Sequence, residues 1–317
     1  MTPSRPLSGL RVGISISGGT DVAEYGFTDA GINRLTVRVT RALLEHGRAL
    51  AFGHDWRDNG IMDAVCRSAL DSFGFPGEQA PRPLILSLIP WPDETLLDRE
   101  LRERLGRVLA VTEAGLPREL AAMLPVDLAR RPKTDPDLRY ARSRALTHLR
   151  RRLNRECRAR ICLGGKERQF SGRYPGIFEE ALFALQAEQP LYLVGLLGGA
   201  AKQVGQAILD RAPLPPSFGQ DVFHPPEKGC LPLADLYREW EGRQQVEWQQ
   251  RPRDPLDDRA LDLKASWELA REFGALRLAH CNYLSVEENR RLLVTDLEDE
   301  ALHLVLMGLR RMTLIHG

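Results

Sequence analysis

Residues 161–182 read ICLGGKERQFSGRYPGIFEEAL, and this stretch joins the end of an apolar run to a charged glycine turn and the start of a helix. The run that ends at Gly164 and Gly165 has the length and composition of a buried strand. Pro175 and Gly176 then open a segment whose apolar residues recur at helical spacing. A buried strand that feeds a helix through a short turn is the βα unit of a parallel sheet.

The same alternation of strands and helices runs through most of the chain. Further strand-length apolar runs lie at residues 10–17, 48–52, 83–90 and 190–195, with a less regular one at 103–111. Helical spacing of apolar residues covers residues 32–46, 58–70, 138–158, 176–189 and 198–211. Residues 112–136 contain several prolines, and we expect them to be irregular. The pattern predicts an α/β fold, with a Rossmann-like, doubly wound and mostly parallel sheet and a helical C-terminal extension.

The composition of the chain changes after about residue 210. Several prolines follow, then polar helical segments at 231–248 and 259–273, and an end that indicates helices without a clear new strand. We therefore predict a ligand-binding domain over residues 1–210. Residues 211–317 are predicted to form a proline-rich segment and helical extension that packs on the core or on a partner chain.

Composition and charge exclude several classes of protein. The 317 residues include 44 Lys and Arg against 43 Asp and Glu, so the net charge of +1 gives no overall reason to expect nucleic acid as a partner. The five cysteines lack the spacing of a zinc site, so no metal is predicted, and no cofactor is implied. No run approaches the roughly 20 apolar residues of a membrane span, and the first residues do not resemble a signal peptide. We expect a cytoplasmic protein that does not contact a membrane.

Most of the predicted strands end in glycine turns with polar residues in or after them. In a doubly wound sheet these turns gather at the carboxyl edge, where ligands bind. Glycine there lets a ligand approach the backbone, and the helix starts that follow favour phosphate, although a single glycine turn can also serve tight geometry alone. The candidate ligand-binding residues at this edge are Gly18, Gly19, Thr20, Gly53, His54, Asp55, Gly164, Gly165, Lys166, Arg173, Gly176, Gly198 and Gly199.

Glu179 and Glu180 follow the charged turn in the first turns of the predicted helix. A glutamate there can accept hydrogen bonds from sugar hydroxyls or act as a general acid or base, or it can simply complement the helix dipole. Consecutive helical residues point about 100° apart, so the two cannot face a ligand equally. The chain contains no P-loop motif and no G-x-G-x-x-G after its first strand, which argues against the common nucleotide fingerprints.

Other polar and aromatic residues have two interpretations. The arginines at 150–152 are more typical of a solvated helix face than of a nucleic-acid patch, because aromatic residues for base stacking are absent nearby. Arg139, Arg142 and Arg144 on the same helix are better candidates for ligand contacts. His54 and Asp55 either act together as a general base in catalysis or have a structural role in the turn. Trp56 and Trp91 either stack on a nucleotide base or belong to the core or to an interface.

GGKERQFSGRYPGIFEEAL resembles the phosphate-binding and glutamate segment of the SLOG superfamily, which includes the Lonely Guy phosphoribohydrolases. It is more similar to the SLOG domains of bacterial conflict systems, including those near or fused to TIR domains. The resemblance extends to AFGHDWRDNGIMDAV, where His54 stands in place of a second glycine, and to PLYLVGLLGGAAKQVGQAI. It covers about residues 10–210.

The resemblance implies a Rossmann-like fold that binds a nucleotide or a nucleotide-derived signal, such as an ADP-ribose or NAD product, in bacterial nucleotide signalling or defence. The alternative that it implies is an N-glycoside hydrolase of the phosphoribohydrolase type, with Glu179 or Glu180 as the catalytic carboxylate. We expect a homo-oligomer and a separately encoded TIR or effector protein as partner.

Overall fold

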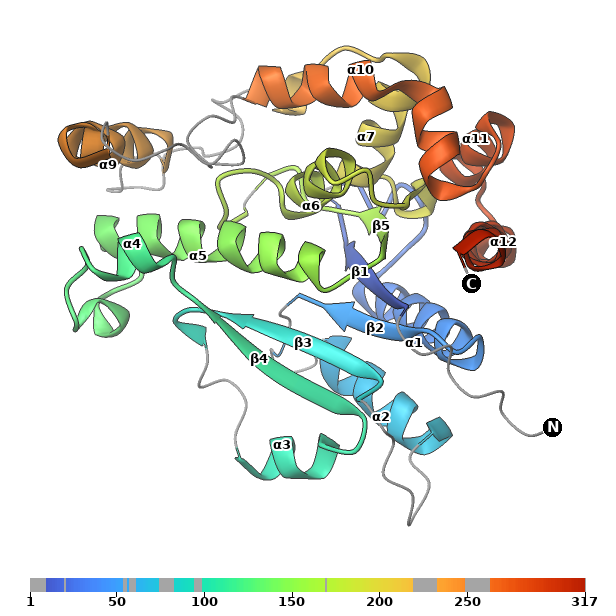
Figure 1. Cartoon of the computed structure of the whole chain (residues 1–317), viewed down its shortest axis with the longest axis horizontal. Helices are drawn as coiled ribbons and strands as arrows, with labels where there is room; N and C mark the ends of the chain where they lie inside the picture. Colours follow the sequence, from blue (N-terminus) through green and yellow to red (C-terminus); the bar gives the residue numbers. More distant parts are fainter. Residues whose placement is uncertain are drawn as a thin grey trace.

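Figure 1 shows the computed structural model of the chain, which describes residues 10–19, 21–53, 56, 61–73, 83–93, 99–168, 170–218, 233–248 and 263–316. In these residues the strands form one six-stranded sheet, in the order β4-β3-β2-β1-β5-β6. The strands are β1 (Arg11–Ser17), β2 (Ala49–Phe52), β3 (Ile85–Pro90), β4 (Leu109–Gly115), β5 (Ala159–Gly164) and β6 (Leu191–Val194). Each neighbouring pair is parallel, so the predicted α/β fold is confirmed and the sheet is wholly parallel.

The order of the strands reverses at the centre of the sheet. The chain runs outward from β1 through β2 and β3 to β4, and β5 then returns to the other side of β1. The register pairs Ser17 with Gly164, so the last residues of β1 and β5 lie side by side. This reversal makes the carboxyl ends of β1 and β5 the expected ligand-binding crevice of the fold.

Helices cover both faces of the sheet because strand side chains alternate between the faces. Leu50 and Phe52 of β2 pack with α1 (Asp29–Glu45) and α2 (Ile61–Phe73) in the largest core cluster. Ala51, which points the other way, packs against α5 (Pro136–Arg155). α6 (Gly176–Gln186) and α7 (Gly199–Asp210) extend that second layer over β5 and β6. Figure 1 shows α5 and α6 on one side of the sheet and α1 and α2 on the other.

Two predicted segments differ from the structure. The run expected to be a strand at 103–111 contains the end of a helix, α3 (Arg99–Leu105), and β4 begins only at Leu109. The sequence RELRERL consists of good helix formers, and Gly106 follows it. The segment expected to be irregular at 112–136 completes β4 and holds a short helix, α4 (Arg118–Ala121).

The described part of the C-terminal extension consists of helices. They are α9 (Leu233–Trp248), α10 (Leu263–Asn282), α11 (Val286–Val294) and α12 (Glu298–His316). α10 packs along α7, and α11 packs against β6. Asn282 is buried and links these elements, since its side-chain amide donates to the Leu191 carbonyl at 2.9 Å and to Asn289 at 2.7 Å.

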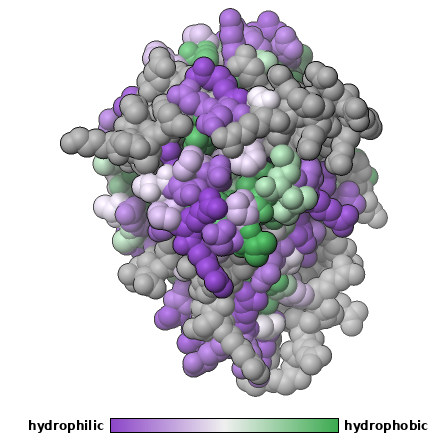
Figure 2. Space-filling model, turned by 90° about the vertical axis from the view of Figure 1, so that its left-hand side faces the viewer, coloured by the Kyte–Doolittle hydropathy of each residue, from purple (hydrophilic) through white to green (hydrophobic). Residues whose placement is uncertain are grey.

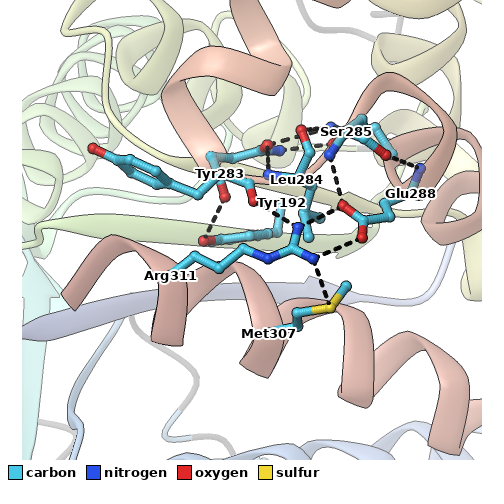
Figure 3. A network of polar contacts seen from close by, with 9 residues as sticks. Tyr192, Tyr283, Leu284, Ser285, Glu288, Met307 and Arg311 are labelled. Carbon is cyan, nitrogen blue, oxygen red and sulfur yellow. Dashed lines mark hydrogen bonds and ion pairs between the residues drawn. The ribbon is translucent and has the colours of Figure 1, made fainter. Parts of the chain in front are cut away.

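Figure 3 shows the polar network at the joint of these helices, where Arg311 of α12 donates to the Glu288 carboxylate at 2.7 and 3.0 Å. Ser285 and Glu288 also form a reciprocal capping box at the start of α11. The Tyr192 hydroxyl of β6 donates to the Asn282 carbonyl at 3.1 Å, so the network ties the extension to the sheet.

The described surface is mostly polar on the face shown in Figure 2, where hydrophilic side chains outnumber a central group of hydrophobic ones. Among the described helices, none combines the length and the apolar character needed to cross a bilayer.

Candidate functional site

A pocket of about 240 Å³ opens at the carboxyl ends of β1 and β2, beside the reversal of strand order. Its walls come from these strands, the start of α2, the second half of α5, the loop after β5 and the first turns of α6. The polar residues in the wall are Ser15, Ser17, Arg150, Lys166 and Glu180. The apolar residues include Phe52, Ile61, Leu149, Phe170 and Ile177. The pocket therefore combines cations, one carboxylate and an apolar wall.

Four of the residues singled out from the sequence line this pocket: Gly53, Lys166, Gly176 and Glu180. Gly53 follows β2, whereas the other three lie in the loop after β5 and the first turns of α6, far from β2 in sequence. Thr20, His54 and Asp55 lie outside the described residues.

Four of the remaining candidate glycines pack turn against turn at the same edge, namely Gly19, Gly164, Gly165 and Gly199. The Gly165 amide donates to the Ser17 carbonyl at 2.9 Å, and the Gly165 carbonyl accepts from the Ala200 amide at 3.2 Å. A Cβ on Gly19 would lie 3.1 Å from the Gly199 Cα and 3.3 Å from the Gly165 carbonyl oxygen. Because three turns approach one another this closely, their packing alone accounts for glycine at these positions.

The starts of α6 and α7 differ in what meets their free amides. The Gly199 amide at the start of α7 donates to the Asp21 carboxylate at 3.3 Å, so a side chain of the protein already takes this position. At the start of α6 the N-cap residue is Pro175, whose side chain carries no hydrogen-bonding group. Gly176 and Ile177 of this first turn line the pocket. The α6 start is therefore the better seat for an anion.

The two glutamates of α6 have different surroundings. Glu180 lines the pocket, and its Oε2 accepts hydrogen bonds from Arg160 Nη1 at 3.0 Å and from the Ser15 hydroxyl. Glu179 is only 1% exposed, and its carboxylate accepts from Thr147 Oγ1 at 2.6 Å and from Arg150. Of the two carboxylates, the one that faces the pocket is Glu180.

Arg150 is a pocket residue that the sequence interpretation missed. Its side chain is 11% exposed, pairs with Glu179, and lies with its Nε 3.7 Å from Glu180 Oε1. The interpretation of residues 150–152 as a solvated helix face is wrong for Arg150. The available signal was its spacing, since Leu146, Leu149 and Arg150 lie on one face of α5 and all three line the pocket.

A model of the family described as SLOG cluster2 matches residues 6–251. The chain belongs to the SLOG cluster2 family. The predicted membership of the SLOG superfamily is confirmed, while the TIR-associated branch stays a prediction. The match extends past residue 210 to the end of α9, so the family region of this SLOG protein includes the proline-rich segment.

No curated protein matches the SLOG chain. Among solved structures it is similar to the X-ray structure of TM1055, a target of the Northeast Structural Genomics Consortium. The two chains are 15% identical with a TM-score of 0.35, over 74% of this chain and 99% of that one.

Arg173 of the SLOG chain lies in a different cluster from the pocket. Its guanidinium stands 4.7 Å from the ring centroid of Tyr237 and 5.5 Å from that of Tyr174. Tyr237 belongs to α9, and burial raises the pKa of its phenol. Tyr140 of α5 stacks on Trp240 of α9 at 5.0 Å in the same cluster. The structure thus gives Arg173 a contact with α9, and its expected contact with a ligand phosphate stays a prediction.

The other arginines proposed as ligand contacts also meet protein groups. Arg142 donates to the Asp93 carboxylate at 3.1 Å, and Arg144 is buried with its guanidinium donating to the Tyr140 hydroxyl at 2.9 Å. Trp56 is a core residue, since its side chain is buried and donates to the Ser87 hydroxyl at 2.9 Å.

Two buried cysteines of the SLOG chain, Cys157 and Cys162, lie near Arg160 and Glu180. Burial raises the pKa of Cys162 to about 12 and that of Cys157 to about 11, so both remain thiols at neutral pH. Neither is poised as a nucleophile, because the thiolate is the reactive form. In the described part of the chain no three His, Cys, Asp or Glu side chains gather as metal ligands.

Proposed function

We propose that the pocket binds a nucleotide or nucleotide-derived ligand, with the ribose beside Glu180 and the phosphate beside Lys166 and the start of α6. The observation that carries this proposal is that one pocket holds a carboxylate acceptor, an exposed cation and a helix start whose N-cap residue, Pro175, makes no side-chain hydrogen bond. A ribose presents hydroxyl donors to the carboxylate, and a phosphate suits the cation and the helix start.

The charges in and beneath the pocket favour an anionic ligand. Three cations (Arg150, Arg160 and Lys166) and two carboxylates (Glu179 and Glu180) leave a local charge of +1. The apolar wall on the side of β2 and α2 provides a surface for a base. A volume of about 240 Å³ is small beside the roughly 300–1,000 Å³ of pockets that enclose drug-sized ligands. A nucleoside phosphate unit fits this space better than a complete dinucleotide, of which the pocket would take one half.

The cellular setting belongs to the same proposal. Membership of the SLOG cluster2 family supports a nucleotide-related role. We place that role in bacterial nucleotide signalling or defence, with a homo-oligomer and a separately encoded TIR or effector protein as partner. Light scattering of the purified chain, with and without bound nucleotide, tests the oligomer.

Ligand identity is tested first by denaturing the purified protein and analysing the released nucleotides by mass spectrometry. Calorimetry with AMP, GMP, CMP, UMP, NAD and ADP-ribose then gives affinities. We expect Lys166→Ala to weaken binding about tenfold, as for loss of one charge-assisted hydrogen bond of about 1.5 kcal/mol.

Arg168→Ala is the matched control, because Arg168 is an exposed cation on the same loop but lies outside the pocket wall in the described residues. Equal losses in both variants would indicate attraction by bulk charge. Unchanged affinity in the Lys166 variant would remove the pocket from the proposal.

A second candidate function is hydrolysis of the N-glycosidic bond of a nucleotide. It is favoured by the position of Glu180, since a carboxylate beside a ribose can stabilise an oxocarbenium-like transition state. Glu180 is held by Arg160 and Ser15, which suits a fixed hydrogen-bond acceptor and makes binding the first proposal. Chromatography decides: a hydrolase releases free base, and Glu180→Gln stops the release while the nucleotide still binds. If the wild-type protein binds a nucleotide but releases no free base, hydrolysis is excluded and the binding function is supported.

A further inference from the structure

Arg160 is a fully buried cation in the centre of the sheet. Its side chain on β5 is 0% exposed, and its Nη1 donates to Glu180 Oε2 at 3.0 Å and to the Ser15 hydroxyl at 2.9 Å. Its Nε donates to Asn154 Oδ1 at 3.3 Å. Strand β1 and helices α5 and α6 therefore all contribute partners to this one guanidinium of β5.

The neighbouring strand leaves space for this side chain. A Cβ on Gly13 of β1 would lie 3.2 Å from the Arg160 Cζ and 2.9 Å from the Cys157 sulfur. Both distances are shorter than ordinary van der Waals contact, so a larger residue at position 13 would displace the Cys157 sulfur or the guanidinium. Glycine at this position therefore leaves room for both side chains.

Stability alone does not account for such a pair. Replacement of a buried ion pair by apolar residues of similar volume is often neutral or stabilising, because desolvation of both charges is costly. What the pair does provide is a fixed carboxylate. Arg160 and Ser15 hold Oε2, and Oε1 is left on the side of Arg150 and the pocket.

We propose that Arg160 is a positioning residue that acts with Ser15 to hold the Glu180 carboxylate towards the pocket, so that the site selects ligands with free ribose hydroxyls. This inference rests on the proposed function and adds a substrate class to it. A fixed carboxylate whose donor is missing loses its hydrogen bond without compensation, so nucleotides that lack the 2′- and 3′-hydroxyls are rejected.

The experiment compares AMP, GMP, CMP and UMP with their 2′,3′-dideoxy forms by calorimetry. In the wild-type protein we expect the dideoxy forms to bind about 10- to 100-fold more weakly. In Arg160→Met we expect the gap to fall below about threefold, because the ribonucleotides lose affinity and the dideoxy forms do not. Arg160→Lys is expected to restore part of the gap, since it keeps the charge without the planar fork.

A purely structural role for Arg160 gives a different result, because a damaged pocket would weaken both classes of nucleotide by the same factor and leave the gap unchanged. If Arg160 acts through Glu180 as proposed, adding Arg160→Met in the Glu180→Gln background should cause no further loss of affinity for ribonucleotides, whereas a purely structural role would cause one. If the Arg160 variant does not fold, Ser15→Ala provides the same comparison. A difference in affinity between ribonucleotides and dideoxy forms as large as in the wild type would then overturn the inference.

The failures of the two proposals can be told apart. Equal binding of ribose and dideoxy forms by the wild-type protein overturns the inference and leaves nucleotide binding in place. If no mononucleotide binds, the inference falls, and the proposed function falls with it only when NAD and ADP-ribose also fail to bind.

Discussion

Gly164 joins β5 to the loop that enters the pocket, and its φ of 65° lies in the left-handed region. A Cβ at this position would overlap the Ser17 carbonyl oxygen of β1 and lie 3.1 Å from the Leu197 Cβ. The residue therefore sets how closely the ends of β1 and β5 approach. Its contribution is to the geometry of the sheet edge, and through that geometry to the pocket.

We expect Gly164→Ala to lower the free energy of unfolding by at least about 2 kcal/mol, because the left-handed backbone and the contact with Ser17 are both strained. Gly242→Ala in α9 is the matched control, since a Cβ there meets no described atom within 4 Å. It should stabilise the helix by up to about 1 kcal/mol. Urea unfolding of both variants measures the difference, and similar values for the two would contradict the packing seen at the sheet edge.

Arg150 and Arg173 show why residue types alone could not define the site. Both belong to charged stretches, and the sequence favoured Arg173 because it lies in the loop before α6. In the structure Arg150 lines the pocket, whereas the guanidinium of Arg173 lies over the ring of Tyr237. The position of each arginine side chain depends on a partner that is distant in sequence, and a local sequence pattern does not identify that partner.

The helices and strands could be predicted from the sequence more completely than the residues of the site. β1, β5 and β6 follow from short apolar runs, and α5 and α6 from regular apolar spacing, so the parallel sheet and its carboxyl edge could be read from the chain. α1 begins at Asp29, before its first apolar repeat, because Thr28 caps it by accepting from the Gly31 amide. Local spacing does not show which helix start is already occupied, as that of α7 is by Asp21.

The start of α11 illustrates an element fixed by charge. A hydrogen bond from Arg311, together with one from the Ser285 backbone amide, holds the pKa of the Glu288 carboxyl below its usual range. Because the folded-state pKa is lower than that of the unfolded chain, the carboxylate stabilises the fold above a pH of about 4.3. That stability is lost as the pH falls through the folded-state pKa.

Glu288→Gln should therefore cost about 1 kcal/mol of unfolding free energy at pH 7 and progressively less below about pH 4. Urea unfolding at pH 7, 5 and 3.5 measures the gap between variant and wild type. Glu287→Gln is the control for loss of one negative charge, since Glu287 is exposed on the same first turn. A gap for Glu288→Gln that is constant across this pH range would contradict the ion pair of Figure 3.

At the scale of the whole molecule, helices α10, α11 and α12 share hydrophobic core clusters with the strands of the sheet. Trp267 of α10 is 0% exposed and donates to the Ala212 carbonyl at 3.1 Å. Leu292 and Leu304 belong to the cluster that contains the central strands. Elements β1, β2, α5 and α6 contribute to the pocket wall. The extension packs elsewhere, because α10 contacts α7 and α11 contacts β6.

Leu293 of α11 packs closely against helix α7 and so joins the extension to the helices that cover the sheet. It is 3% exposed, and a Cβ on Gly205 of α7 would overlap its Cδ1. The two residues therefore have complementary sizes, and a change in one should depend on the other.

We expect Leu293→Ala to lower the free energy of unfolding by about 2–5 kcal/mol, as for a buried leucine, and Gly205→Ala to lower it by about 1–3 kcal/mol through overpacking. In the double variant the added methyl group occupies space that the leucine has vacated, so the combined loss should be smaller than the sum by at least about 1 kcal/mol. Leu297→Ala serves as the control, because Leu297 is 61% exposed and its loss should change stability by less than about 0.5 kcal/mol. Urea unfolding of the four variants completes the cycle. Strictly additive losses would mean that α11 does not pack on α7 in solution, and the extension would then be a separate unit.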